Sequence, residues 1–189
     1  MTGILEGRVA IETGAVGALG AAHARVYAAE GCAVVVNDIN TDAAQAVVDE
    51  ITAAGGKAVV NSSDITNYDD SLNAVKQAID TFGDLHIVLN NACINRDRMF
   101  ASMTEAEWDA IMSVHLKGHF CISSHAVHYW RGQSKEGKPV DARIINTTSG
   151  AGLQGSIGQS NYAAAKAGIA ALTLNQAAEL ARYGITANA

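Results

Sequence analysis

Short, uninterrupted apolar runs alternate along this chain with longer segments of helical periodicity, and this alternation constrains the fold more than any other feature. The runs predict strands at 9–11, 33–36, 58–60, 87–89, 144–146 and 185–187. Strands that are apolar at every position are buried on both faces, which is typical of parallel sheets covered by helices. With right-handed crossovers, the pattern predicts an α/β fold with a Rossmann-like, doubly wound parallel sheet.

The segments between these strands carry helix start and stop signals. The predicted helices cover 19–30, 41–54, 68–82, 104–130 (as one or two helices) and 161–183. Gly31, Gly83 and Gly184 follow three of them, as glycine often does at helix C-termini. Thr104 and Glu107 have the spacing of a capping box. We expect 134–141 to form a polar loop, and residues 1–189 to form a single domain.

Composition excludes several classes of protein. The 189 residues include 13 Lys and Arg against 19 Asp and Glu, a net charge of −6, so we expect no nucleic-acid partner. Hydrophobic residues make up 49% and charged residues 17%, which excludes a charge-rich disordered chain.

The cysteines and the apolar runs bear on location. Cys32, Cys93 and Cys121 are far apart and odd in number, so a disulfide framework or a metal site is not expected. The N-terminus lacks the apolar core of a signal peptide, and no run approaches the ~20 residues of a membrane span. The sequence therefore predicts a cytoplasmic protein without a membrane partner.

A glycine-rich segment, TGAVGALG at positions 13–20, joins the first predicted strand to the first helix. Such a turn lets backbone N–H groups approach a pyrophosphate, although a simple tight turn would look the same. Asp38 follows the second strand, near the position that bonds a ribose hydroxyl in dinucleotide sites. Its carboxylate would repel a 2′-phosphate, and positions 13–20 hold no Lys or Arg, so NAD is favoured over NADP.

Tyr162 and Lys166 are four residues apart in a predicted helix, so their side chains share one face. In most helices such a pair has no catalytic role: the tyrosine packs against its neighbours and the lysine carries its charge into solvent. However, an ammonium group favours the phenolate form of a neighbouring tyrosine, as proton transfer to or from an alcohol requires. Ser149 follows the fifth predicted strand, and its hydroxyl could hydrogen-bond a substrate oxygen as charge develops. The three residues together predict a catalytic group.

In combination, these motifs resemble the short-chain dehydrogenase/reductase family over essentially the whole chain. The family's TGxxxGxG loop matches here except that Ala18 replaces its middle glycine, and its YxxxK motif matches Tyr162 and Lys166. The resemblance implies a secondary alcohol or ketone as substrate. It also implies a cofactor site made of Thr13, Gly14, Gly17, Leu19, Gly20, Asp38, Asp64, Ile65, Asn90, Asn91, Ala92, Tyr162 and Lys166.

His115 stands where the family usually holds a fourth catalytic residue, Asn. An imidazole there could support a water relay toward Lys166, whereas a lone histidine in a long helix is commonly a packing residue; both interpretations stay open. The other histidines are interpreted as structural or surface residues.

The stretch 95–120 resembles the dehydrogenase unit of the peroxisomal multifunctional enzymes (type 2) of β-oxidation and related bacterial proteins. This implies oxidation of a 3-hydroxyacyl thioester to its 3-ketoacyl form. The similar 3-oxoacyl-carrier-protein reductases run the reverse reaction, usually with NADPH.

Three residues depart from the family pattern. Glu12 puts a carboxylate in the first strand, where burial would raise its pKa. Ala18 and Cys93 replace glycines of the cofactor motifs, and Cys93 is harmless only if its φ is negative. We hypothesise that all three lie near one pocket and weaken cofactor binding, so that changing Glu12 to Val and the other two to Gly would tighten it.

A non-catalytic NAD-binding or assembly module is the alternative function. In the family, helices matching 108–130 and 161–183 pack between subunits, which implies a homo-dimer or homo-tetramer. The chain also ends inside the sixth predicted strand, whereas family members continue with a Pro-Gly turn, a substrate-covering loop and a seventh strand. We therefore expect a C-terminally incomplete domain.

Overall fold

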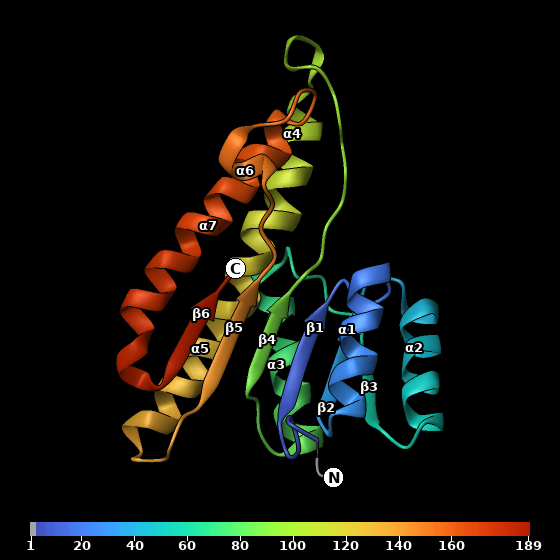
Figure 1. Ribbon diagram of the computed structural model, residues 1–189, viewed down its shortest axis with the longest axis vertical. Coiled ribbons are helices and arrows are strands. Elements are labelled where there is room, and N and C mark those ends of the chain that lie inside the picture. The colour runs from blue at the N-terminus through green and yellow to red at the C-terminus, as the bar shows by residue number, and fades with distance from the viewer. Residues whose placement is uncertain (1–2) are drawn as a thin grey trace.

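The computed structural model describes residues 3–189 and shows a twisted parallel sheet flanked by helices (Figure 1). The strands pair in the order β3-β2-β1-β4-β5-β6, and every pairing is parallel. This order belongs to the doubly wound Rossmann fold, so the predicted fold class is confirmed. The strands are β1 (Val9–Thr13), β2 (Ala33–Asn37), β3 (Lys57–Asn61), β4 (Ile87–Asn90), β5 (Ala142–Asn146) and β6 (Ile185–Asn188).

Helices cover the sheet as two layers, each closing its own apolar core. One core lies between the sheet and α1 and α2, and the other lies against α3, α5 and the end of α7. The helices are α1 (Ala18–Ala29), α2 (Thr41–Ala53), α3 (Tyr68–Phe82), α4 (Glu105–Ile111), α5 (Gly118–Lys135), α6 (Ala151–Gln154) and α7 (Ser160–Leu180).

The predicted helix 104–130 is interrupted in a way that its sequence pattern does not reveal. Thr104 and Glu107 form the predicted capping box at the start of α4. A π-helical segment, Met112–Lys117, then joins α4 to α5. A π-helix, in which backbone hydrogen bonds join residues five apart, is rare and often occurs at functional sites. It turns His115 inward, where the side chain is fully buried.

Two other boundaries differ from the prediction. α5 runs to Lys135 and so takes the first residues of the predicted loop 134–141. The four-residue helix α6 follows β5 and was not predicted, because it is too short to show a period of its own. Within residues 3–189, none of the helices is both long and apolar enough to cross a membrane.

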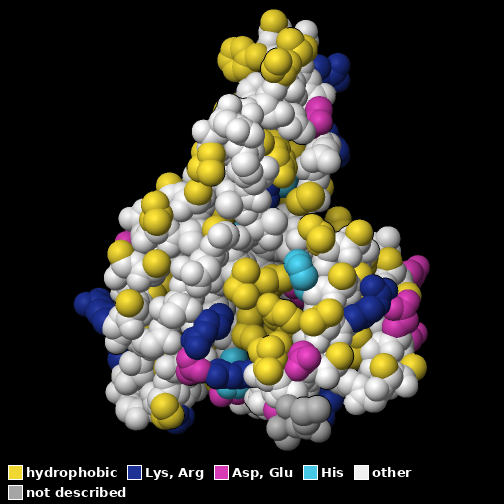
Figure 2. Space-filling view, in the orientation of Figure 1, with side chains coloured by type: hydrophobic (Ala, Val, Ile, Leu, Met, Phe, Trp, Pro, Cys, Tyr) yellow, Lys and Arg dark blue, Asp and Glu magenta, His cyan; other side chains and the backbone are white. Residues whose placement is uncertain are grey.

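The molecule narrows beyond the carboxyl ends of β4 and β5, where α4, α6 and the start of α7 project from the sheet (Figure 1). Apolar side chains gather at this narrow end (Figure 2). Met99, Phe100, Leu153 and Ile157 are exposed, and a bridge between Arg98 and Gln159 joins the two segments that carry them.

The strand order reverses between β1 and β4. The chain leaves β1 through α1 to β2 and β3, then crosses back through α3 to place β4 on the other side of β1. In such sheets the loops at the carboxyl ends of these two strands diverge and leave a crevice for a ligand.

Candidate functional site

The ends of β1 and β4 are joined by the hydroxyl of Thr13. Its Oγ1 accepts hydrogen bonds from the backbone N–H of Asn91 (3.0 Å) and Ala92 (3.2 Å), and donates to the carbonyl of Leu89 (3.3 Å). The Asn91 side chain donates in return to the carbonyls of Thr13 and Gly14. The glycine loop, residues 13–20, is thereby fixed against the loop that follows β4.

Two glycines make this close approach possible. Gly14 has a φ of +65°, and a Cβ there would lie 2.5 Å from the Cα of Ala92. A Cβ on Gly20 would lie 2.3 Å from the carbonyl oxygen of Gly14. Both distances are shorter than any ordinary carbon contact. A side chain at Gly14 would force the two loops apart, and one at Gly20 would displace the glycine loop itself.

A cavity of about 590 Å³ opens beside this contact, at the carboxyl ends of the strands. Its size is within the ordinary range of small-molecule sites. Its wall contains two carboxylates, Asp38 and Asp64, and within residues 3–189 it holds no Lys or Arg. The lining residues are Gly14, Val16, Gly17, Ala18, Leu19, Gly20, Asn37, Asp38, Ile39, Asn40, Ser63, Asp64, Ile65, Thr66, Asn91, Ala92, Cys93, Ile94 and Val114.

The two carboxylates of the wall also organise their own loops. Asp38 accepts from the N–H of Val16 at 3.4 Å and from that of Asn40 at 2.9 Å, so it ties the end of β2 to the glycine loop. Asp64 accepts from both the N–H and the hydroxyl of Thr66.

The predicted cofactor residues Thr13 and Asn90 lie behind the cavity wall. Both are buried, and neither lines the cavity. The Asn90 amide donates to Ser123 Oγ and to Asn146 Oδ1, each at 2.9 Å. In this geometry Thr13 and Asn90 hold the strand ends in place. The residues that follow them, Gly14 and Asn91, line the cavity.

Tyr162, Lys166 and His115 lie together beside Ile94 of the cavity wall, although none of the three lines the cavity itself. The Lys166 Nζ lies 5.5 Å from the centre of the Tyr162 ring, and the His115 ring meets the same ring edge-on at 5.3 Å. His115 Nε2 lies 2.9 Å from the carbonyl oxygen of Ile94, which lines the cavity.

Burial controls the charges in this group. The Lys166 side chain is only 1% exposed, and its Nζ donates to the carbonyl of Thr147 at 2.5 Å. Burial lowers the pKa of Lys166. Burial also lowers the pKa of His115 to about 4, so the imidazole is neutral near pH 7. One cation therefore faces the Tyr162 ring.

Ser149 lies on the segment that leaves β5. Its Oγ accepts from the N–H of Ala151 at 3.2 Å, at the start of α6. The neighbouring Thr148 hydroxyl donates to the backbone carbonyl of Lys166, and Gly152 packs so closely on α7 that a Cβ would lie 2.7 Å from the Lys166 carbonyl carbon. Sequence reasoning did not single out Thr147 and Thr148, although polar residues after a buried strand were a signal for them.

The three departures from the family pattern do not share one pocket. Ala18 and Cys93 line the cavity, but Glu12 does not, so that part of the hypothesis is wrong. Alternation along β1 turns the Glu12 side chain toward α1, where His23 Nδ1 lies 3.4 Å from its Oε1. Cys93 fits its loop, because within residues 3–189 no residue other than glycine has a positive φ.

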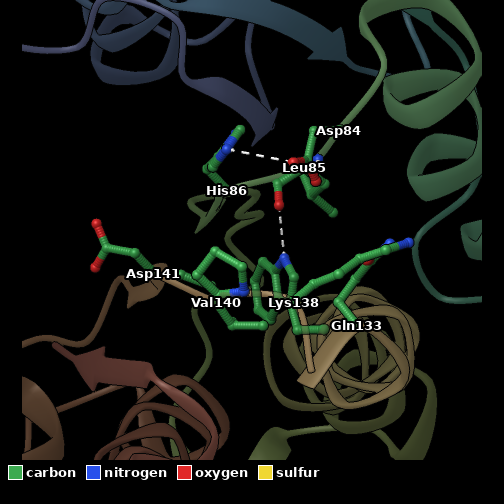
Figure 3. Close-up of a pocket in the computed structure, with 10 residues that line it drawn as sticks. Asp84, Leu85, His86, Gln133, Lys138, Val140 and Asp141 are labelled. Carbon is green, nitrogen blue, oxygen red and sulfur yellow. Dashed lines mark hydrogen bonds and ion pairs between the residues drawn. The ribbon is translucent and has the colours of Figure 1, made fainter. Parts of the chain in front are cut away.

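A second cavity, of about 270 Å³, lies at the opposite end of the strands, where β4 and β5 begin (Figure 3). There Trp130 Nε1 donates to the carbonyl of Leu85 at 2.7 Å, and His86 Nε2 lies 3.5 Å from Asp84 Oδ2. None of the predicted site residues lines it. Within residues 3–189, no three His, Cys, Asp or Glu side chains gather as metal ligands.

Known proteins are similar to this chain in sequence and in structure. A family model described as short chain dehydrogenase matches residues 8–189. Hydroxyacyl-CoA dehydrogenase ChsB1 of Mycobacterium tuberculosis is 50% identical, over 97% of this chain and 60% of its own length. The peroxisomal multifunctional enzyme type 2 of Mus musculus is 40% identical, over 97% of this chain and 25% of its own length. A crystal structure of a short chain dehydrogenase from Mycobacterium avium matches with a TM-score of 0.96 at 58% identity, covering 98% of this chain and 67% of that one.

We expect Gly14→Ala to destabilise the protein by about 1–3 kcal/mol, because alanine is strained at positive φ and its methyl group meets Ala92. The same change at Gly132, inside α5 with open space around it, serves as a control and should stabilise by about 0.5–1 kcal/mol. Urea unfolding measures both. Equal effects of the two changes would contradict the close contact of the loops.

Glu12 gives stability a distinctive pH dependence. Burial raises the pKa of Glu12 from 4.5 to about 9, so the folded protein keeps a proton that the unfolded chain loses above about pH 4.5. The free energy of unfolding should therefore fall as the pH rises from about 4.5 toward 9, by up to ~1.4 kcal/mol per pH unit. Glu12→Gln should flatten this slope, whereas Glu179→Gln, on the exposed face of α7, should not. Parallel slopes for wild type and Glu12→Gln would refute the prediction.

Proposed function

Because the chain belongs to the short-chain dehydrogenase family, we propose that it interconverts a secondary alcohol and a ketone by transferring a hydride to or from NAD. One observation carries the proposal. His115 contacts both Ile94 in the cavity wall and the Tyr162 ring, so a tyrosine with a buried lysine beside it lies next to the wall of the cavity that we propose for the dinucleotide.

The residues of the cavity fit a dinucleotide. Gly17, Ala18, Leu19 and Gly20 bring the N-terminus of α1 to its wall, where the helix dipole and free N–H groups favour a pyrophosphate. The Asp38 carboxylate can accept hydrogen bonds from ribose hydroxyls and opposes a 2′-phosphate. With no Lys or Arg among the described lining residues to offset this repulsion, NAD is the better fit.

The acid–base chemistry falls to Tyr162. Its phenolate accepts the hydroxyl proton of the alcohol. Bound NAD would accept the hydride that leaves the carbon bearing this hydroxyl group. Lys166 stays near the ring because Thr147 holds its ammonium group, which lies 5.5 Å from the ring centre. Ser149 donates a hydrogen bond to the substrate oxygen. Each alcohol oxidised yields one ketone, one NADH and one proton.

We propose a 3-hydroxyacyl thioester as the substrate, which is supported by the relatives named as hydroxyacyl-CoA dehydrogenase and as multifunctional enzyme type 2. The chain spans about 60% of the length of the first of these relatives. A 3-oxoacyl-carrier-protein reductase and a non-catalytic NAD-binding module are the alternatives.

We also propose a cytoplasmic location.

We also propose that two or four copies associate through α5 and α7. An apolar groove of about 440 Å³ lies there, lined by Met112, Leu116, Phe120 and Leu172 together with two polar residues, Ser113 and Lys117. Phe120 is half-exposed and Leu174 on α7 is largely exposed, so a partner would cover apolar surface.

The assay for the proposed activity follows the absorbance of reduced nicotinamide with 3-hydroxyacyl thioesters and simple secondary alcohols. Tyr162→Phe should lower kcat by at least ~10²-fold, the usual contribution of general acid–base catalysis, and should keep NAD affinity within about threefold by calorimetry. Tyr183→Phe, far from the cavity, is the control. Undiminished turnover in Tyr162→Phe would exclude Tyr162 as the acid–base group. NAD binding without turnover in the wild type would favour the non-catalytic module.

Asp38→Asn tests the choice of cofactor. Removing the carboxylate charge should raise NADP affinity by roughly tenfold relative to NAD, about 1.4 kcal/mol. Asp42→Asn, at an exposed position on α2, is the control. Calorimetry with both dinucleotides measures the ratio, and an unchanged ratio in Asp38→Asn would count against Asp38 as the selecting residue.

A further inference from the structure

Most arginines of this chain are paired with a carboxylate, but two are not. The ion pairs are Arg8 with Asp141, Arg25 with Glu50, Arg98 with Glu107 and Arg143 with Asp141. Within residues 3–189, Arg131 on α5 and Arg182 after α7 pair with no carboxylate. A guanidinium group has five N–H donors in a planar fork and no acceptor, so both arginines keep donors that can hold an anion.

The ring of Tyr183 brings the two arginines together. The Cζ of Arg131 lies 5.2 Å from the ring centre, and the Cζ of Arg182 lies 4.8 Å from it. The face of an aromatic ring attracts a cation but does not neutralise it. Desolvation raises the pKa of Tyr183, whereas the two guanidinium groups lower it and prevail. The surroundings of this ring are therefore positive, although the chain as a whole carries a net charge of −6.

The backbone that carries both arginines is anchored. Trp130 on α5 precedes the first of them and is buried, and its Nε1 donates to the carbonyl of Leu85 at 2.7 Å. After α7 the chain makes one 3₁₀ turn, Ala181–Tyr183, which ends at Gly184 with a φ of +77°. A Cβ on Gly184 would overlap the carbonyl oxygen of Val140, so this turn lies closely against the segment that leads into β5.

A cavity of about 460 Å³ lies where α5 meets the end of α7. It is lined by Arg131, Ala178, Glu179, Leu180, Arg182 and Tyr183. Glu179 is the one carboxylate among these lining residues, so two positive charges face one negative charge. Arg131 Nε is buried and has no hydrogen-bond partner within residues 3–189. A buried donor without a partner costs free energy, so the site suits an anion that brings acceptors.

This cavity is separate from the candidate active site. α7 carries Tyr162 in its first turn and ends at Leu180, and its 21 residues span roughly 30 Å. The end of α7 lies at the opposite end of the molecule from α4 and α6 (Figure 1). A ligand bound there does not meet the tyrosine–lysine pair, so its role is one of binding and not of reaction.

We propose that Arg131 and Arg182 form a second binding site, which takes the phosphate group of a small molecule. A guanidinium fork can give two parallel hydrogen bonds to phosphate oxygens, and two such forks surround one group. A bound phosphate would join α5 to the turn after α7 and offset the repulsion between two like charges. The inference is independent of the proposed function, because it requires neither a dinucleotide nor turnover.

Two other roles for these arginines make different predictions. The C-terminal end of α7 has a partial negative charge, so the arginines could serve only to stabilise this helix end. In an oligomer they could instead pair with a carboxylate of a second copy. Neither role requires phosphate.

Nuclear magnetic resonance tests the site residue by residue. With ¹⁵N-labelled arginine, inorganic phosphate at millimolar concentration should shift the Nε–H signals of Arg131 and Arg182 in the wild type. The signal of Arg25, which is paired with Glu50, should stay in place, and sodium chloride at the same ionic strength should move none of them. Signals of Arg131 and Arg182 that phosphate leaves unmoved would overturn the proposal.

Variants test the affinity, followed at the ring-proton signals of Tyr183. Arg131→Gln combined with Arg182→Gln should weaken phosphate binding at least ~10-fold, because both forks are lost. Lys57→Gln combined with Lys76→Gln removes the same charge from exposed positions on β3 and α3 and should have less than a twofold effect. Arg131→Lys combined with Arg182→Lys keeps the charges without the forks, should bind with intermediate affinity, and serves if the glutamine variant does not fold. Equal affinity in the wild type and both arginine variants would contradict the site.

Stability and oligomeric state separate the other two roles. Phosphate should raise the midpoint of thermal unfolding more in the wild type than in the double glutamine variant. An equal rise in both proteins would leave the arginines as helix-end residues only and overturn the proposal. Light scattering should give both proteins the same oligomeric state, whereas dissociation of the variant alone would assign the arginines to an interface between copies and likewise overturn it.

Two probes decide where the phosphate group comes from. Glycerol 3-phosphate should shift the same arginine signals as inorganic phosphate, which supports a small-molecule ligand. Sedimentation with vesicles that contain phosphatidic acid, lost in the double glutamine variant and without any response to glycerol 3-phosphate, would overturn the small-molecule ligand in favour of a lipid headgroup. None of these readouts needs turnover, so an inactive wild type would count against the proposed function alone.

Discussion

The contact between the ends of β1 and β4 determines the geometry on which the rest of the site depends. It is small, with one threonine hydroxyl, one asparagine side chain and two glycines, but it lies where the strand order reverses. By holding the glycine loop against Ala92, it sets one wall of the cavity and the path of the chain toward Ile94. Ile94 in turn contacts His115 and so connects the cavity to the tyrosine and lysine of α7.

Behind this wall the protein buries an unusual number of polar groups. Lys166, His115, His119, Asn90 and Asn146 are all buried beneath the carboxyl ends of β4 and β5, where a purely structural core would be apolar. Burying polar groups costs free energy unless they are hydrogen-bonded, so such a cluster persists where the bonds are made or where function requires it. Glu12 is a separate case, because it lies on the other face of the sheet, where its Oε1 is 3.4 Å from His23 Nδ1.

Most of the fold and part of the site were predictable from local pattern. Strand positions, their parallel pairing and the helix order follow from apolar runs and glycine stops, and all six predicted strands are present. Tyr162 and Lys166 were predictable as neighbours because helix periodicity fixes which residues share a face. The π-helical segment was not, because its sequence shows ordinary helical spacing, and its contacts from His115 to Ile94 and Tyr162 join residues far apart in the chain.

The sequence by itself determined the fold class, the glycine loop, the acidic residue after β2 and the tyrosine–lysine pair, because each depends on residues close together in the chain. Only the tertiary structure decided which of the predicted residues face the cavity. Thr13 and Asn90 follow the family motif but are buried as ties between strands, and Glu12 faces α1 instead of the cavity. The inward position of His119 was likewise hidden, because burial and hydrogen bonding are set by residues from β4, β5 and α7 that lie far apart in the sequence.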